Sequence, residues 1–322
     1  MNPDFKDYLL KATNSAACEE VDIIQSLWSG YGKISRYRLQ GSPLDTVVVK
    51  HISLNKADEH PRGWNTDLSH QRKVKSYEVE IRWYQQWNEH CTASSRTAKF
   101  LGSLSQKTEQ WIVLEDLDTQ FPVRKQYVDL SEVKTCLAWL ANFHGTYMRK
   151  EPKGLWEIGT YWHLATRPEE FEKIEHTELK RKAHKLDELL TSCTYQTIVH
   201  GDAKLANFCF SESGKNVAAV DFQYVGGGCG MKDVAYLLGS CLSSHECETH
   251  NQALLDFYFS KLEKALKNVN HAIDFNALEQ EWRNMFPIAW TDFTRFLLGW
   301  MPAHQKVNNY SLSVMQSVLL KL

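Results

Sequence analysis

The stretch TIVHGDAKLANFCF, residues 197–210, places four side chains able to do chemistry between two apolar runs, and it decides how the rest of the chain is interpreted. The flanking runs have the composition of short strands. A plain turn between strands also favours Gly, Asp and Asn for backbone reasons, so a purely structural interpretation is open at this point. The polar residues of the stretch are, in order, His200, Asp202, Lys204 and Asn207.

The length and composition of the chain indicate a folded protein with two parts. A chain of 322 residues exceeds the size at which single hydrophobic cores stop growing. Its 43% hydrophobic and 24% charged residues are typical of a folded chain rather than a disordered one. A formal net charge of -2 gives no overall field that would attract nucleic acid or an anionic membrane, so we expect neither as a partner.

The start of the chain lacks the basic segment and apolar core of a secretory signal, and we expect a cytoplasmic protein. Its eight cysteines occur singly, as reduced thiols in such a protein do. Cys241, His245, Cys247 and His250 could be interpreted as a zinc site. Their spacing matches no standard zinc finger, and the segment has the composition of a helix end followed by a polar loop, which we favour.

Periodicity in the first third predicts a small antiparallel sheet with helices. Apolar residues at helical spacing predict helices over 3–13 and 74–90, and β-branched or alternating runs predict strands over 33–40, 46–54, 97–105 and 109–117. The polar, Pro- and Gly-punctuated segment 56–73 predicts a loop.

After residue 118 the pattern changes to long helices. These are expected over 130–150, 169–193, 251–269, 275–301 and 310–322, with a short strand over 216–224. We therefore predict an α+β, two-lobed fold. Its small N-terminal antiparallel-sheet lobe would span residues 1–116, and its larger, mainly helical C-terminal lobe would span 117–322.

The spacing of His200, Asp202 and Asn207 is H-x-D-x4-N, the pattern of protein-kinase catalytic loops. In that pattern the Asp receives or orients the proton of the substrate hydroxyl, and the Asn holds a magnesium ion. Fourteen residues after Asn207, at the end of an apolar run, the sequence AVDFQY places Asp221 where a second metal-binding aspartate is expected. Amide and carboxylate oxygens are ligands of the kind that Mg²⁺ takes.

Two features upstream point to phosphate binding. Lys50 lies among valines in a predicted strand, where an unpaired ammonium group would be costly, so it needs an anionic partner. Glu80 can supply one, and Glu78, on another face of the same helix, is the rival. Gly30, Gly32 and Ser35 lie on a turn, where glycines let backbone N–H groups approach phosphate oxygens.

Taken in order, these motifs resemble the aminoglycoside phosphotransferase and choline kinase superfamily, whose members share the protein-kinase-like fold. VDFQY and the G-x-G-x-x-S turn are most similar to the ecdysteroid kinase-like branch. The resemblance covers roughly residues 20 to 310.

The resemblance implies a role for each motif residue. The N-terminal lobe would bind the nucleotide and the C-terminal lobe would hold the catalytic and acceptor-binding residues. Asp202 would be the catalytic base, Asn207 and Asp221 the Mg²⁺ ligands, and Lys50 with Glu80 the phosphate-positioning pair. Leu114, Glu115 and Asp116 would form the connector that hydrogen-bonds adenine through backbone atoms. Lys204 would lie beside the moving γ-phosphoryl, although many members of that branch carry an aromatic residue there.

Two further residues have a structural interpretation. His200 is expected to support the loop rather than transfer a proton. Asp233 would brace the catalytic loop at the start of the next helix, or it would simply be a helix N-terminal carboxylate, and these roles are compatible.

The implied function is an ATP- and Mg²⁺-dependent small-molecule kinase, choline-, aminoglycoside- or ecdysteroid-kinase-like, whose acceptor is an alcohol that can also carry an amine. The alternative is a nucleotide-binding pseudokinase or scaffold without transfer activity. A protein kinase is disfavoured, because residues 222–232 are too few for a peptide-docking activation segment and lack A-P-E. Trp282, Trp290, Trp300 and Asp292 would form either a cation-binding pocket or ordinary core, and core is favoured.

Overall fold

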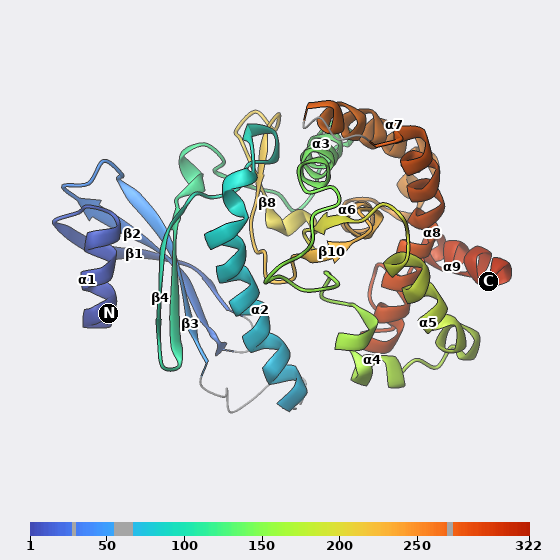
Figure 1. Ribbon diagram of the computed structural model, residues 1–322, viewed down its shortest axis with the longest axis horizontal. Helices are drawn as coiled ribbons and strands as arrows, with labels where there is room; N and C mark the ends of the chain where they lie inside the picture. Colours follow the sequence, from blue (N-terminus) through green and yellow to red (C-terminus); the bar gives the residue numbers. More distant parts are fainter. Residues whose placement is uncertain (28–29, 55–66, 269–272) are drawn as a thin grey trace. The chain divides into compact units, whose positions relative to one another are not determined.

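The chain divides into two units in this computed structural model, which describes residues 1–27, 30–54, 67–268 and 273–322 (Figure 1). The first unit comprises Met1–Glu89 and Thr97–Gln120, and the second comprises His90–Arg96 and Phe121–Leu322. The predicted division of function between residues 1–116 and 117–322 stays a prediction.

The first unit is built on a five-stranded antiparallel sheet. In the order of their pairing, its strands are β1 (Ala17–Ser26), β2 (Gly32–Gln40), β3 (Thr46–Ser53), β5 (Glu109–Glu115) and β4 (Phe100–Gln106). Side chains alternate between the two faces of each strand, so each face meets a different helix. Val47 and Val49 of β3 pack with Phe5 and Leu9 of α1 (Pro3–Ala12), whereas Lys50 faces Glu80 of α2 (Asp67–Gln86).

The predicted strands of this unit are confirmed, but β1 was missed. It lies at the edge of the sheet, and most of its residues are exposed. Irregular pairing with β2 between Glu20 and Asp22, and between Ile23 and Gln25, interrupts the alternation that would mark a strand. The predicted loop over 56–73 is wrong from residue 67 onward, where α2 begins, and its residues 56–66 lie outside the described residues.

The second unit is mainly helical, which confirms the predicted fold class. Its helices are α3 (Leu130–Thr146), α4 (Pro168–Glu172), α5 (Thr177–Thr191), α6 (Met231–Cys241), α7 (Ser244–Asn268), α8 (Phe275–Trp300) and α9 (Asn309–Lys321). Its short strands are β6 (Val123–Arg124), β7 (Thr197–Val199), β8 (Phe208–Phe210), β9 (Val217–Ala219) and β10 (Gly226–Gly228). They form a three-stranded sheet, β6-β8-β9, and a β10-β7 pair.

Three boundaries in this unit differ from the predictions. The helix expected over 169–193 is two helices, because His176 caps a new one by accepting a hydrogen bond from the Leu179 N–H. The polar loop expected after Cys241 is wrong, since α7 already begins at Ser244. The strand expected over 216–224 is confined to β9, and the chain then turns before β10 begins at Gly226.

All eight cysteines are thiols rather than disulfides. The five buried ones are Cys136, Cys193, Cys209, Cys229 and Cys247. Among the described residues, no group of three or more His, Cys, Asp or Glu side chains could hold a metal ion, which includes the residues of the zinc alternative. Over the same part of the chain, no helix is long and apolar enough to cross a membrane.

Candidate active site

The H-G-D loop leaves β7 at Val199 and passes through a short 3-10 helix, Leu205–Asn207, into β8. Gly201 has a φ of +80°, and a Cβ built there would lie 2.0 Å from the backbone oxygen of Tyr224. No side chain fits such a position, and a non-glycine residue would also be strained by the positive φ. The middle residue of the motif is therefore glycine because the loop turns against a neighbouring backbone.

Asp233, in the first turn of α6, holds this loop in place through hydrogen bonds to its backbone. Its carboxylate accepts hydrogen bonds from the His200 N–H at 2.6 Å and the Gly201 N–H at 3.0 Å. His144 of α3 donates from Nε2 to the same carboxylate at 3.1 Å, while its Nδ1 lies 2.8 Å from the Tyr258 hydroxyl. Asp233 is fully buried, so both expected roles apply: it is a helix N-terminal carboxylate and it braces the loop.

His200 has a structural place inside the loop. Its Nε2 lies 3.0 Å from the Val220 oxygen, and its Nδ1 accepts the Asp202 N–H at 3.2 Å. Burial lowers the pKa of His200, although nearby Asp233, Asp202 and Asp221 act against this. A neutral imidazole that donates from Nε2 and accepts at Nδ1 satisfies both contacts. Both nitrogens are occupied within the protein, as expected for a supporting residue.

The two carboxylate oxygens of Asp202 have different surroundings among the described residues. Its Oδ2 accepts hydrogen bonds from Lys204 Nζ at 2.9 Å and from Asn207 Nδ2 at 3.0 Å. Its Oδ1 is buried and accepts no hydrogen bond within 3.5 Å from the described residues, although the Tyr236 hydroxyl lies near enough to the carboxylate for the carboxylate to raise the pKa of Tyr236. A buried carboxylate oxygen is costly to leave unsatisfied, so Oδ1 is the atom suited to accept a proton donor from outside the chain.

Lys204 remains a cation beside this carboxylate. Burial alone would lower its pKa, but Asp202 and Asp221 outweigh that effect and raise it. The ammonium group is thus paired on one side and able to face another anion.

Asn207 and Asp221 are tied together through Val220. The Val220 N–H donates to the Asn207 backbone oxygen at 3.0 Å, and Val220 in turn receives the hydrogen bond from His200. Asp221, which follows β9, has a φ of +69°, and its Oδ1 accepts a hydrogen bond from Gln223 at 2.7 Å. Asn207 directs its amide nitrogen at Asp202, which leaves its amide oxygen as the atom able to bind a cation. An amide oxygen and a carboxylate are hard oxygen ligands, so these residues fit Mg²⁺.

The first unit contains the predicted lysine-glutamate pair. Lys50 Nζ and Glu80 Oε2 lie 2.6 Å apart, and both side chains are buried. The ring centre of Tyr77 lies 5.7 Å from the same ammonium group. Glu78, the other possible partner of Lys50, is exposed, so Glu80 is the residue that pairs with Lys50.

The glycine turn lies between β1 and β2. Gly30 has a φ of +75° and Gly32 a φ of +129°, and a Cβ on Gly32 would lie 2.0 Å from the His51 oxygen. Ser35 belongs to β2, and its hydroxyl donates to Glu20 at 3.3 Å. It shares a face with Tyr37, whose ring contacts Phe5 of α1, whereas Lys50 faces α2. The structure therefore does not bring the Ser35 side chain to Lys50.

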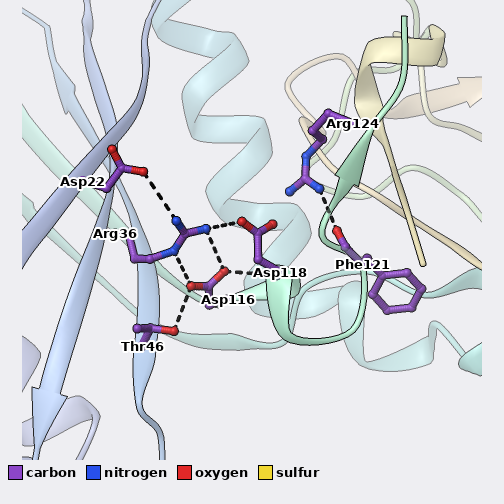
Figure 2. Close-up of polar contacts among 7 residues, drawn as sticks. All are labelled: Asp22, Arg36, Thr46, Asp116, Asp118, Phe121 and Arg124. Atoms are coloured by element: carbon purple, nitrogen blue, oxygen red, sulfur yellow. Dashed lines mark hydrogen bonds and ion pairs between the residues drawn. The ribbon is translucent and has the colours of Figure 1, made fainter. Parts of the chain in front are cut away.

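The connector after β5 is fixed by side chains (Figure 2). Arg36 of β2 donates from Nε to Asp116 Oδ2 at 2.6 Å and also pairs with Asp118, and Thr46 donates to Asp116 Oδ2 at 2.8 Å. Burial would raise the pKa of Asp116, but the hydrogen bonds from Arg36 and Thr46 outweigh it and lower the pKa. Leu114 pairs with β3 and β4 within the sheet. The Asp116 side chain is thus occupied in positioning the connector. Any hydrogen bond from the connector to adenine would therefore come from backbone atoms.

Sequence reasoning missed a group of tyrosines beside Asp202. The Tyr161 N–H donates to the Gly201 oxygen at 3.1 Å, and the Tyr161 ring lies 5.6 Å from that of Tyr236 and 5.9 Å from that of Tyr224, edge to face. Burial raises the pKa of Tyr161 and Tyr236, and the charge of Asp202 adds to the effect in both. These residues come from three separate segments, so no local pattern could have grouped them.

The tryptophans considered for a cation pocket are mainly core. Trp282 is fully buried and donates from Nε1 to the Tyr195 oxygen at 2.9 Å, and Trp290 donates to Ser311 at 3.0 Å. Asp292 pairs with Arg295 at 2.8 Å and accepts a hydrogen bond from Trp162. A neutralised, buried carboxylate is not available to an external cation, which supports the favoured interpretation as core.

Comparison with known proteins gives one family match. A family described as "Uncharacterized oxidoreductase dhs-27" matches residues 163–318, just under half of the chain. The matched region contains Asp202, Lys204, Asn207 and Asp221. A search of curated proteins gave no match.

Solved structures similar to this chain include small-molecule kinases. An aminoglycoside-3'-phosphotransferase of type VIII is 15% identical, with 87% of this chain and 98% of that one covered and a TM-score of 0.45. An aminoglycoside phosphotransferase from Streptomyces rimosus, solved with ADP and streptomycin, is 14% identical, with 89% and 98% covered and a TM-score of 0.49. A putative fructosamine-3-kinase from Haemophilus somnus is 10% identical, with 98% and 96% covered and a TM-score of 0.48.

These kinases are the kind of protein that the sequence motifs resemble, but at 10–15% identity and with TM-scores below 0.5 they do not assign this chain to a superfamily. At these TM-scores the likeness supports no assignment of individual residues, and the roles proposed below rest on the geometry of this chain.

Proposed function

We propose that this protein is a phosphotransferase that moves the γ-phosphoryl group of ATP to a hydroxyl of a small molecule, with Mg²⁺. The observation that carries the proposal is the set of contacts of Asp202: its Oδ2 accepts hydrogen bonds from Lys204 and Asn207, while its buried Oδ1 accepts no hydrogen bond within 3.5 Å from the described residues. A carboxylate fixed in this way is suited to accept the hydrogen bond of an acceptor hydroxyl and orient its oxygen for attack.

The other residues have roles that follow from their contacts. Asn207 and Asp221 would hold Mg²⁺, which when bound neutralises charge on the phosphates. Lys204 would stabilise negative charge that develops on the transferred group, since it is a cation next to the base. Lys50, kept in place by Glu80, would bind phosphate oxygens, and the backbone of the Gly30–Gly32 turn would do so as well. The eight thiols are consistent with a reducing compartment, and we place the protein in the cytoplasm on that basis.

Substitution of the base tests the proposal. We expect Asp202→Asn to lower kcat by ~10²- to 10⁴-fold, because it removes the positioned base while keeping the shape of the side chain. Binding of ATP with Mg²⁺ should change little, since Asp202 faces the acceptor. ADP release over a broad panel of alcohols measures the first quantity, and calorimetric titration with a nonhydrolysable ATP analogue measures the second.

Asp256→Asn, at an exposed carboxylate on α7, is the matched control and should behave as the wild type. Wild-type turnover by Asp202→Asn would contradict the assignment of the base. Binding of ATP without ADP release on any alcohol would favour the pseudokinase alternative.

A further inference from the structure

Lys306 is a cation beside the catalytic loop that the proposed mechanism leaves unused. It lies between α8 and α9, where its N–H donates to His304 Nδ1 at 3.1 Å and its carbonyl oxygen accepts a hydrogen bond from Ser311 at 2.7 Å. These contacts fix the backbone on both sides of the residue. The direction in which its side chain leaves the chain is therefore set by the local turn.

The ammonium group of Lys306 lies against aromatic rings. Its Nζ is 4.5 Å from the ring centre of Tyr236 and 5.5 Å from that of Phe293. Both rings belong to a buried cluster with Trp162 and Phe296. Within the described parts of the chain, Lys306 forms no ion pair with an Asp or Glu side chain. It is thus a partly buried cation that contacts ring faces.

The same ammonium group is electrostatically coupled to the catalytic residues. Burial lowers the pKa of Lys306 to about 8, Asp202 acts in the opposite direction, and Lys204 adds to the lowering. Tyr236, the ring beneath Lys306, is in turn affected by the charge of Asp202. Contacts link Lys306 to the loop as well: its Nζ lies on the Tyr236 ring, that ring lies 5.6 Å from the ring of Tyr161, and the Tyr161 N–H donates to the oxygen of Gly201, next to Asp202.

This arrangement bears on the charge of the acceptor. Ring faces such as that of Tyr236 commonly bind an organic ammonium group, but here a lysine of the chain occupies that face. A cationic acceptor at this ring would be repelled by the ammonium group of Lys306, and the partial burial of the site would strengthen that repulsion. An anionic group would instead give Lys306 the counter-charge and the charge-assisted hydrogen bonds that it lacks.

We propose that Lys306 binds an anionic group of the acceptor, so that the substrate is an alcohol carrying a carboxylate, a sulfate or a phosphate. The inference rests on the proposed function and specifies its substrate class. It replaces the expectation that the acceptor could carry an amine.

Binding is measured first, because it does not depend on turnover. The panel presents each alcohol scaffold with a carboxylate, a sulfate, a phosphate, a neutral amide or a trimethylammonium group, in the presence of a nonhydrolysable ATP analogue. We expect anionic members to raise the Tm of the wild type and to raise it much less in Lys306→Met. Comparing the three anions identifies which of them the site takes.

Steady-state kinetics on the best acceptor measure how much Lys306 contributes to acceptor binding. Loss of a hydrogen bond between charged groups corresponds to a rise of KM by about 10- to 100-fold in Lys306→Met, with a smaller change in kcat. Lys306→Arg should recover part of the affinity, and Lys306→Glu should shift preference toward the trimethylammonium member. Lys264→Met, at an exposed lysine on α7, is the matched control and should leave KM unchanged.

The inference is overturned if the best acceptor is neutral or cationic, or if Lys306→Met and the wild type respond alike to every member of the panel. Phosphate transfer to a neutral alcohol with normal KM in Lys306→Met would overturn it while leaving the proposed function intact. Anion-dependent binding that requires Lys306, without ADP release, would support this site and contradict the proposed function instead.

Discussion

His200 uses both ring nitrogens within the protein, one toward Val220 and one toward Asp202, and its ring contacts Trp139 and Phe222. A side chain with this environment can determine the shape of the loop over residues 200–207 without exchanging protons. The effect of its lowered pKa should then appear in stability rather than in the chemical step.

The pH dependence of unfolding tests this role. Because the folded-state pKa of His200 lies below the ordinary value of 6.5, the unfolded state binds the proton first as pH falls, and stability decreases below about pH 6.5. At and above pH 7.5 both states are neutral and this contribution vanishes. We expect His200→Phe to be less stable by about 1–3 kcal/mol at pH 7.5, yet to lose less stability than the wild type between pH 6.5 and 5.

Urea unfolding at a series of pH values provides the measurement. His245→Phe, at an exposed histidine on α7, should keep the wild-type pH dependence. An unchanged slope in His200→Phe would show that other groups cause the acid sensitivity.

Lys50 and Glu80 allow a second test at single positions. Removing one member of a buried ion pair leaves an uncompensated charge, which costs about 3–5 kcal/mol. We expect Lys50→Met and Glu80→Gln each to lower the free energy of unfolding by that order, and the double variant to lose clearly less than their sum. Denaturant unfolding of the four proteins completes the cycle, and additive losses would count against a tight pair.

At the scale of elements, the hairpin of β1 and β2 depends on one glycine more than on the other. Gly32 combines a φ of +129° with an approach of 2.0 Å between a built Cβ and the His51 oxygen, whereas Gly30 has a φ of +75° and open space around it. Both positions strain a side chain, but only Gly32 lacks room for one.

We therefore expect Gly32→Ala to destabilise the first unit by at least about 2 kcal/mol and to weaken ATP binding. Gly30→Asn should cost less than about 1 kcal/mol, because Asn tolerates the left-handed region where Gly30 lies. Thermal unfolding and nucleotide titration of both variants measure the difference. Equal losses of stability in the two variants would mean that the positive φ, rather than the lack of room for a Cβ, makes glycine necessary in this turn.

Elements were predictable where one pattern runs without interruption. The apolar stripe of α8 and the β-branched run of β3 gave their type and approximate bounds. β1 was not predictable in this way, because an exposed edge strand with irregular pairing leaves little periodicity. The split between α4 and α5 depends on a histidine cap, a signal that sequence patterns rarely include.

At the scale of the whole molecule, the candidate site was predictable where its residues follow a fixed spacing. Asp202, Lys204 and Asn207 lie within one loop, and their hydrogen bonds join residues only a few positions apart in the sequence. The pairing of Lys50 with Glu80 followed from the cost of a buried charge, which requires some partner. The grouping of Tyr161, Tyr236 and Lys306 was not predictable, because segments distant in the sequence bring these three side chains together only after folding.

The five buried cysteines all belong to the second unit, whereas Cys18 of the first unit is partly exposed. Burial holds the pKa of Cys136 and Cys229 well above the ordinary range and raises that of Cys247 to about 12. Alkylating reagents attack thiolates, so these sulfurs become reactive only in molecules that have opened. The unit that contains Asp202 thus carries its own reporters of local unfolding, distributed from α3 to α7 and usable without introducing a label.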